Sequence, residues 1–283
     1  MDINGQAQLP VFLRRVAIKD YKSIASCDVE LERLTFLVGP NGSGKSNFLD
    51  ALRFCADALR NSLDQAIRDR GGINEVRRRA GGRPNHFAVR ITLEVLSKYR
   101  FDYHFEIGAR TGGGYAVQRE ECIWQGLKDP AEHGEFSVRN GVVAQSSVKT
   151  PPPAANDRLY LVTIAGHPGF EPLYKALSTM GFYNLNPDRI RDLQSPDSGE
   201  LMARNGDNLT AVFANLTRTE PGRAERVIEF LSLVVPGIET VTTRALGPKE
   251  TLEFRERSEG DERARKFLAA SMSDGTLRAL GVL

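Results

Sequence analysis

Residues 39–46 have the types and the spacing of a phosphate-binding loop. They read Gly-Pro-Asn-Gly-Ser-Gly-Lys-Ser and fit the pattern G-x-x-x-x-G-K-[ST]. Glycines allow several backbone N–H groups to point at one anion, and a helix that starts at the loop adds the positive end of its dipole. In such a loop, Lys45 reaches the β- and γ-phosphates of a nucleotide and the Ser46 hydroxyl binds Mg²⁺.

The residues around this motif predict the elements that hold it in place. Residues 34–38, Leu-Thr-Phe-Leu-Val, predict a buried strand directly before the loop. Apolar residues recur at helical spacing from Ser46 to about Arg60 and predict a helix directly after it. A Gly-rich turn with an exposed lysine is the alternative interpretation, and the flanking strand and helix disfavour it.

A second motif lies at the far end of the chain. Residues 273–276, Ser-Asp-Gly-Thr, stand at the start of an apolar helix that continues to Leu283. A helix N-terminus offers free N–H groups and a dipole to an anion, so this one can contact the nucleotide of a neighbouring subunit. For the tetrapeptide alone, an ordinary serine or aspartate cap is the better interpretation.

The first half of the chain between the motifs is mainly a strand pattern. Before the loop, alternation of apolar and polar residues predicts two antiparallel strands over residues 11–31. After the loop helix, we expect a short helix at 63–69 and an exposed basic loop at 77–84. Period-two runs separated by Gly-rich turns then predict a β-meander over residues 87–148.

The second half has a helical character. We expect an apolar segment at 159–164, a helix at 171–179 and a short strand at 182–185. Asn208 and Pro221 mark the starts of two further helices, which end near residues 216 and 235. Two strands, at 239–246 and 251–257, and a helix from Asp261 precede the second motif.

The composition is that of an ordinary globular protein. Of the 283 residues, 41% are hydrophobic and 26% are charged, and the net charge of +2 provides no general attraction to nucleic acid or to an anionic membrane. No apolar run approaches the roughly 20 residues that cross a bilayer, and the N-terminus lacks a signal-peptide pattern. Three widely spaced cysteines predict reduced thiols. We therefore expect a cytoplasmic protein.

Together, the two motifs and their surroundings resemble one protein family. Residues 16–24, Val-Ala-Ile-Lys-Asp-Tyr-Lys-Ser-Ile, and residues 34–52 look like the opening of the RecF, SMC and OLD-type branch of the ABC-ATPase superfamily. Residues 182–187, Phe-Tyr-Asn-Leu-Asn-Pro, and residues 271–278 are similar to the bacterial RecF-like AAA-family ATPases within it. In these ATPases, the last segment replaces the LSGGQ signature.

The resemblance implies an α/β fold, a P-loop NTPase head of the ABC type with an antiparallel β-rich insert and a small helical lobe. Residues 1–70 would hold the first strands, the phosphate loop and the first helices of the nucleotide-binding lobe. Residues 71–200 would form the β-rich insert and the return to the core sheet, and residues 201–283 the helical lobe with the signature-like helix. The three parts make one incomplete ATPase domain.

The resemblance also implies that two heads bind head to tail around two molecules of ATP with Mg²⁺. Each ATP lies between the phosphate loop of one head and the signature of the other. Carried over by position, the contacts of Ser273 and of the Gly275 backbone would be with the partner's γ-phosphate. The ATP-binding residues of the phosphate loop would be Gly39, Asn41, Gly42, Ser43, Gly44, Lys45, Ser46 and Asn47, with Ser46 also at the Mg²⁺.

The sequence departs from the family pattern at one position and leaves a second family residue unassigned. Asp274 replaces a glycine of the signature, and its charge is unfavourable next to a phosphate unless the side chain turns away. The family also has a glutamine that senses Mg²⁺ and the γ-phosphate at the junction into the helical lobe. Gln194 lies near that junction and Gln118 is the other candidate.

The catalytic residue is unknown. Hydrolysis in this superfamily uses a strand that ends in Asp-Glu after the signature helix, with the glutamate acting on the attacking water. The sequence reaches Leu283 within that helix and contains no such strand, so we expect it to be the N-terminal part of a longer ATPase.

Two functions from different classes follow. The first is a RecF-like ATPase in which ATP closes a dimer of heads, acting in DNA repair or maintenance or in anti-phage defence, with DNA and an effector protein as further candidate partners. Its DNA part rests on analogy and on arginines 77, 78, 79 and 83, although such a cluster is more often a solvated loop. The second is a regulatory module that binds ATP without hydrolysing it. Measured turnover separates the two.

Two other nucleotide-binding classes fit less well. Residues 69–72, Asp-Arg-Gly-Gly, match the D-x-x-G motif of GTPases, but they follow a predicted helix and the guanine motif N-K-x-D is absent from the sequence. A metabolite kinase would leave the β-meander and the second motif unexplained.

Overall fold

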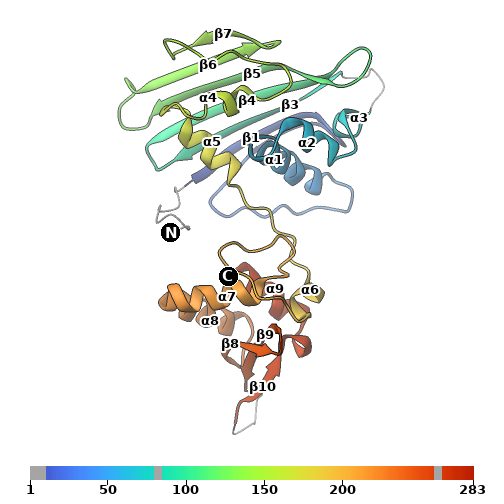
Figure 1. The fold of residues 1–283 in the computed structure, drawn as a ribbon, viewed down its shortest axis with the longest axis vertical. Helices are drawn as coiled ribbons and strands as arrows, with labels where there is room; N and C mark the ends of the chain where they lie inside the picture. Colours follow the sequence, from blue (N-terminus) through green and yellow to red (C-terminus); the bar gives the residue numbers. More distant parts are fainter. Residues whose placement is uncertain (1–10, 80–84, 258–262) are drawn as a thin grey trace. The chain divides into compact units, whose positions relative to one another are not determined.

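The computed structural model describes residues 11–79, 85–257 and 263–283. These residues form two compact units, an N-terminal unit up to residue 180 and a C-terminal unit from residue 181 onward (Figure 1). Among the described residues, no helix has the length and apolarity that a membrane span requires. The finer division of the chain at residues 70 and 200 stays a prediction.

The N-terminal unit is built on one seven-stranded antiparallel sheet, in the order β2-β1-β3-β4-β5-β6-β7. The expected strand pair and the expected meander are both confirmed. They are not separate, however, because β1 pairs with β2 on one side and with β3 on the other, so the meander continues the first sheet instead of forming an insert. The strands are β1 (Val11–Tyr21), β2 (Ile24–Glu30), β3 (His86–Val95), β4 (Tyr99–Ala109), β5 (Tyr115–Gly126), β6 (His133–Arg139) and β7 (Val142–Ser146).

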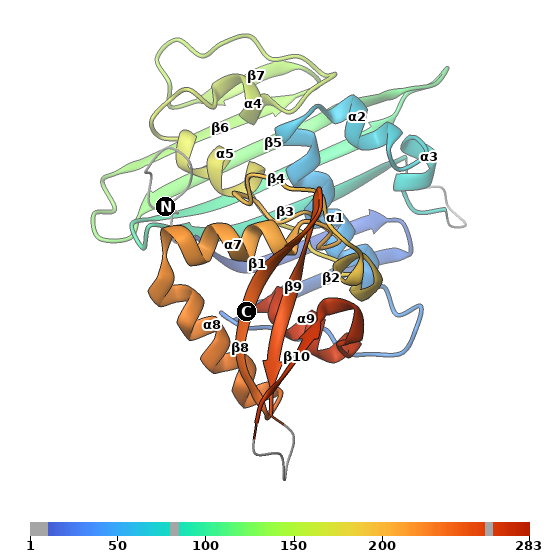
Figure 2. The same ribbon diagram turned by 60° about the horizontal axis from the view of Figure 1, so that its bottom comes forward.

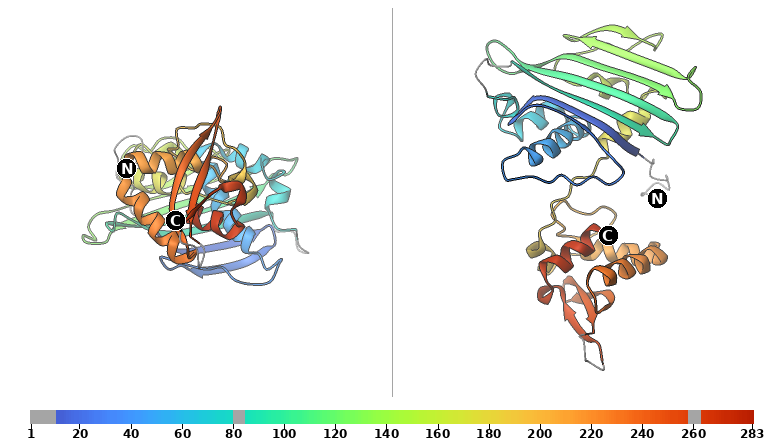
Figure 3. Two further views of the ribbon diagram at one scale, coloured as in Figure 1. Left: turned by 90° about the horizontal axis from the view of Figure 1, so that it is seen from below. Right: turned by 180° about the vertical axis from the view of Figure 1, so that it is seen from behind.

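In the described part of this unit, the helices lie against one face of the sheet (Figure 1). Alternate residues of the strands point at them, and Phe87 of β3 contacts Phe54 of the first helix with ring centroids 5.3 Å apart. Among the described residues of this unit, no helix covers the opposite face (Figure 3), which is usual for an antiparallel sheet. The helices are α1 (Lys45–Arg60), α2 (Leu63–Arg68), α3 (Ile73–Val76), α4 (Tyr160–Ile164) and α5 (Glu171–Ser178).

The C-terminal unit combines helices with a three-stranded antiparallel sheet in the order β10-β9-β8. Figure 2 shows α7 and α8 beside these strands, and buried Phe213, Leu231 and Phe254 join them in one apolar core. The two expected helices are confirmed, and Pro221 begins the second of them. The elements are α6 (Pro187–Arg191), α7 (Leu209–Thr219), α8 (Pro221–Val234), β8 (Ile238–Leu246), β9 (Lys249–Glu256), β10 (Arg265–Leu268), the 3-10 turn η1 (Ala269–Ser271) and α9 (Asp274–Val282).

The buried strand expected at residues 34–38 is wrong. These residues form no strand, and the side chains of Leu34, Phe36 and Val38 are 73%, 77% and 91% exposed. A strand is stable only when a neighbour accepts and donates its backbone hydrogen bonds. Among the described strands, β1 has a partner on each side and β2 has a free outer edge, but residues 34–38 pair with neither, so they form no strand.

Two further expectations in the second half are also wrong. Residues 182–185 form no strand, because the Asn184 N–H donates to the Arg204 carbonyl in a loop (2.8 Å) and not to a ladder. Asp261, where a helix was expected, lies outside the described residues. The described continuation is the strand β10, which pairs with the free edge of β9. Pairing with an available strand outweighs weak helix propensity in so short a segment.

Candidate nucleotide-binding site

The predicted phosphate loop leads directly into α1. Gly44 is the N-cap of this helix with φ +96°, and Gly42 has φ +81°, both in a region that L side chains rarely adopt. No side chain caps α1, and the first N–H groups of a helix have no intrahelical acceptor. A Cβ at Gly39 would approach Ser43 Oγ to 3.1 Å. The backbone thus forms a tight loop with free donors, which suits an anion.

Lys45 folds back across this loop. Its Nζ donates to the carbonyl oxygens of Gly39 (2.7 Å) and Pro40 (2.8 Å) and lies 3.3 Å from Ser43 Oγ. The cation therefore sits among oxygen acceptors, and the oxygens of a phosphate chain offer acceptors of the same kind with a stronger charge. Ser46, the expected Mg²⁺ residue, is exposed at the start of the helix. The residues present fit a nucleoside triphosphate.

The body of α1 is anchored in the core of the N-terminal unit. Phe48, Leu52 and Phe54 are buried on the side of the sheet, and Tyr21 at the end of β1 contacts Phe54 with ring centroids 6.1 Å apart. Every buried apolar residue of α1 lies beyond its first three positions. The loop end of the helix is therefore open to solvent while its body is rigidly held.

The turn between β1 and β2 touches the loop, which sequence reasoning did not reveal. The Asn47 side-chain amide donates to Ser23 Oγ (2.6 Å), and a Cβ at Gly44 would lie 3.6 Å from Ile24 Cγ1. Lys22 in this turn has φ +47°, which is uncommon for a residue with a side chain. The only signal in the sequence was the family-like segment 16–24, which carries no information on contacts.

The signature-like segment is the N-terminus of α9. Ser273 Oγ accepts a hydrogen bond from the Thr276 N–H (3.1 Å) and lies 2.9 Å from Thr276 Oγ1, so Ser273 is a helix cap, as the simpler interpretation of the tetrapeptide predicts. A Cβ at Gly275 would find no atom closer than Ser273 Oγ at 3.8 Å.

Asp274 turns toward a cation within the same unit. Its carboxylate forms an ion pair with Arg191, which also donates to the Met272 carbonyl (3.0 and 3.2 Å). The contact with Asp274 raises the pKa of Arg191. The negative charge that replaces the family's glycine is therefore paired.

Each candidate glutamine has partners within its own unit. Gln194 is only 3% exposed, its Oε1 accepts from the Thr210 N–H (2.8 Å) and its Nε2 donates to the Gly206 carbonyl (3.3 Å), so it secures the start of α7. Gln118 is on β5, and its side-chain amide packs against Gly108 of β4, where a Cβ would collide with it. A nucleotide-sensing role for either residue stays a prediction.

Of the basic loop expected at residues 77–84, the structure describes residues 77–79. Arg77 Nε donates to Asn74 Oδ1 (3.0 Å), and Arg79 binds the Asn74 carbonyl and forms an ion pair with Glu75. Arg83 lies outside the described residues. These contacts tie the side chains of Arg77 and Arg79 to the preceding helix α3.

The site residues fall into two groups. Residues 39–47 come together in the N-terminal unit, and Ser273 and Gly275 belong to the C-terminal unit. The assignment of each to ATP stays a prediction.

A comparison with known proteins finds a family match that includes residues 39–47. A family model described as "AAA domain, putative AbiEii toxin, Type IV TA system" matches residues 34–127. Over 49 residues the chain is 53% identical to the chromosome partition protein Smc of Desulfitobacterium hafniense (strain Y51), a match that covers 16% of the chain and 4% of Smc. Over 41 residues it is 44% identical to the DNA replication and repair protein RecF of Aliivibrio fischeri (strain ATCC 700601 / ES114), covering 14% of the chain and 11% of RecF.

The same identity and coverage hold for RecF of Aliivibrio salmonicida (strain LFI1238). The chain thus spans a small part of the length of these relatives. The partial matches show that this part of the chain is similar to ATPases of the RecF/SMC-like branch, which agrees with the resemblance seen in its sequence.

Proposed function

We propose that this protein binds ATP with Mg²⁺ at residues 39–47, as part of a P-loop NTPase head of the ABC type. One observation carries the proposal: α1 starts at a glycine in a left-handed conformation, has no side-chain cap, and has Lys45 folded over the loop. The first-turn N–H groups and Lys45 would hold the phosphates. Ser46 would be a ligand of the Mg²⁺, which supplies neutralising charge when bound.

An ATPase cycle is the finer part of this proposal. ATP would bring two heads together, with Ser273 and the Gly275 backbone of one head at the γ-phosphate of the other. The pairing of Asp274 with Arg191 supports this geometry because it removes an unbalanced negative charge from the α9 N-terminus. Hydrolysis would then separate the heads.

The cellular role is proposed from the relatives. Two of them are named for chromosome partition and for DNA replication and repair, and we propose a role in DNA repair or maintenance. Anti-phage defence is the alternative, and the toxin system in the name of the matched family model is the observation that favours it.

Titration calorimetry of wild type and Lys45→Ala with Mg-ATP tests the binding site. The variant should lose at least about 1.5–3 kcal/mol of binding free energy, the worth of charged hydrogen bonds, and should keep its unfolding temperature. Lys128→Ala, at an exposed position between β5 and β6, is the matched control and should bind like wild type. Equal ATP affinity in wild type and Lys45→Ala would contradict the assignment.

A regulatory module that binds ATP without hydrolysing it is the second candidate. The carboxylate closest to Lys45 in the sequence, Asp50, is engaged by Tyr21, Lys22 and Arg70, so it does not serve as a general base. We therefore expect residues 1–283 alone to release phosphate from ATP no faster than the buffer background. Steady phosphate release that disappears in Lys45→Ala would refute this expectation.

A further inference from the structure

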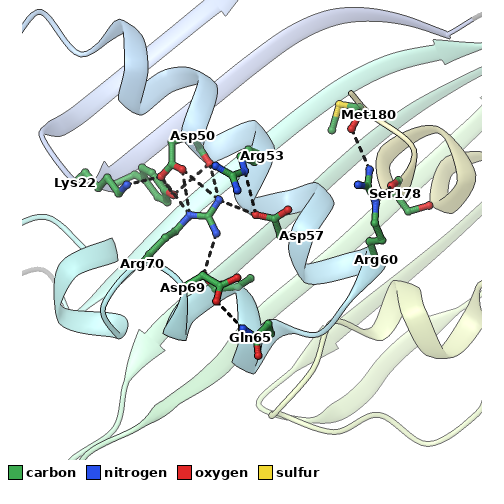
Figure 4. A network of polar contacts seen from close by, with 12 residues as sticks. Lys22, Asp50, Arg53, Asp57, Arg60, Gln65, Asp69, Arg70, Ser178 and Met180 are labelled. Atoms are coloured by element: carbon green, nitrogen blue, oxygen red, sulfur yellow. Dashed lines mark hydrogen bonds and ion pairs between the residues drawn. The ribbon is translucent and has the colours of Figure 1, made fainter. Parts of the chain in front are cut away.

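The buried side chain of Arg70 forms hydrogen bonds with α1 and with α2, the helix that ends just before it. Its side chain is 5% exposed. Its Nε donates to both carboxylate oxygens of Asp50 (3.2 Å each) and its Nη2 to Asp57 Oδ2 (3.0 Å), while its Nη1 donates to the Ala66 carbonyl (2.9 Å) (Figure 4). Two turns of α1 therefore share one guanidinium group.

Asp50 extends this connection to the turn between β1 and β2. Its Oδ2 lies 2.5 Å from Lys22 Nζ and accepts a hydrogen bond from the Tyr21 hydroxyl (2.8 Å). Burial acts to raise the pKa of Asp50, but the hydrogen bonds from Lys22 and Tyr21 and the charge of Arg70 outweigh it, so the pKa lies below its ordinary value. Asp50 is an ionised group shared by Arg70 and the turn.

The same turn is held from a second side by the segment that follows Arg70. The Lys22 N–H donates to the Val76 carbonyl (2.7 Å), and the Arg78 N–H donates to the Asp20 carbonyl (2.7 Å). Asp20 and Lys22 both have positive φ, +53° and +47°, which persists only where surrounding contacts impose it. Since Ser23 of this turn contacts Asn47, its position is passed on to the start of α1.

We propose that Arg70 is a positioning residue for the phosphate-binding loop, acting through Asp50 on the turn at residues 20–24 and on the first turns of α1. This inference rests on the proposed ATP site. Arginine suits the position because its planar fork reaches two carboxylates and a carbonyl at once, which a lysine ammonium does not reproduce. By reciprocity, ATP bound at the loop should stabilise the contacts of the turn with residues 76–78.

The first test compares Arg70→Gln, Arg70→Lys and the control Arg68→Gln by calorimetry with Mg-ATP, at a temperature where each variant is folded by circular dichroism. Arg68 is exposed at the end of α2, two residues before Arg70, and forms an ion pair with Asp64 of the same helix (2.7 Å). We expect ATP to bind roughly tenfold more weakly to Arg70→Gln, less weakened for Arg70→Lys, and within about twofold of wild type for Arg68→Gln.

A double-variant cycle separates positioning from general stability. If Arg70 acts by placing the loop, Lys45→Ala already removes the main contact that depends on this placement, and adding Arg70→Gln should cause little further loss of affinity. Independent, additive losses would overturn the inference. So would a folded Arg70→Gln protein with lower stability and wild-type ATP affinity.

Hydrogen exchange on the wild-type protein provides a test that needs no variant at residue 70. Saturating Mg-ATP should slow exchange of the Lys22 and Arg78 amides, which bond to Val76 and Asp20. Unchanged exchange in a protein that binds ATP would overturn the inference and leave the ATP site intact. A wild type that does not bind ATP at all would overturn both.

Discussion

Two helix N-termini in this chain carry serine and glycine, but they differ in what occupies their backbone donors. At α1, Gly44 provides no side chain, so the first N–H groups have no acceptor within the helix and Lys45 adds a positive charge. At α9, Ser273 already accepts from the Thr276 N–H, and the Asp274 carboxylate beside it is paired with Arg191. The first terminus is ready for an anion, whereas the second is satisfied by its own residues.

At a third helix N-terminus, that of α4, a carboxylate accepts the backbone N–H groups. The N–H groups of Tyr160 and Leu161 at α4 both donate to the buried carboxylate of Glu120 on β5, the second over 2.8 Å, and the Tyr103 hydroxyl donates to the same group (2.9 Å). Here a carboxylate from another element holds the position that a phosphate would hold at α1. The three helix starts therefore differ in their backbone donors: those of α1 have no side-chain acceptor, one of α9 is taken by its own serine, and two of α4 are taken by a glutamate from another strand.

Dimer formation is the most demanding test of the contrast, because α9 would contribute only across an interface. Mg-ATP under non-hydrolysing conditions should shift the protein from monomer to dimer in light scattering, and ADP should not. Ser273→Arg should abolish this shift and leave ATP binding to the monomer intact, since the substitution changes no residue of the phosphate loop. A wild type that stays monomeric in saturating ATP would count against the ABC-type mechanism.

The occupied terminus at α4 predicts a pH effect on stability. Burial raises the pKa of Glu120 from 4.5 to about 7, although the N–H groups of Leu161 and Tyr160 and the Tyr103 hydroxyl act to lower it. The folded protein therefore keeps a proton that the unfolded chain has lost, and this contribution to stability is full below pH 4.5 and lost as the pH rises to about 7. The loss should be on the order of 2–3 kcal/mol.

Glu120→Gln carries no charge, so its unfolding free energy should lack this decline. Urea unfolding of wild type and variant over the range pH 4.5 to 7 measures the difference. Tyr103, Tyr160, Cys55 and Cys122 interact electrostatically with Glu120, and the pKa of each is raised, so these four groups stay neutral over this range. The same decline in both proteins would show that another group is responsible.

Ser273→Ala has the smallest expected effect and sharpens the comparison at α9 itself. Loss of the cap should reduce the free energy of unfolding by about 1 kcal/mol and should leave monomer ATP affinity unchanged. Ser232→Ala, which removes a hydroxyl that bonds the Glu229 carbonyl on α8, is the matched control and should cost less. A Ser273→Ala protein with weaker ATP binding as a monomer would mean that α9 serves its own nucleotide.

The tight turn at residues 39–46 and the helix after it were predictable because they depend on local backbone geometry. Gly42 and Gly44 both have positive φ, a conformation that glycine adopts most easily, so residue type and spacing indicate the turn. The helices α1, α7 and α8 were predictable for a similar reason, since their periodic apolar faces and Pro221 are local signals.

What could not be predicted depends on contacts between distant residues. Residues 34–38 have the composition of a strand, but whether they pair depends on an available partner. Gln194 looked like a candidate ligand, and only the fold shows that its amide is used by α7. The network of Arg70 with Asp50 and Lys22 joins three segments that no spacing rule connects.

The exposed run at residues 34–38 has a consequence for how the protein behaves at high concentration. Leu34, Phe36 and Val38 lie open to solvent in a short segment with β-forming residues and no charge. Such a segment is a template on which another chain can add a strand, and it needs no unfolding of the core to do so. Loss of soluble protein on storage would then follow the square or a higher power of concentration and would be insensitive to gains in thermal stability. A single charge at position 36 would be a more effective remedy than any stabilisation of the sheet.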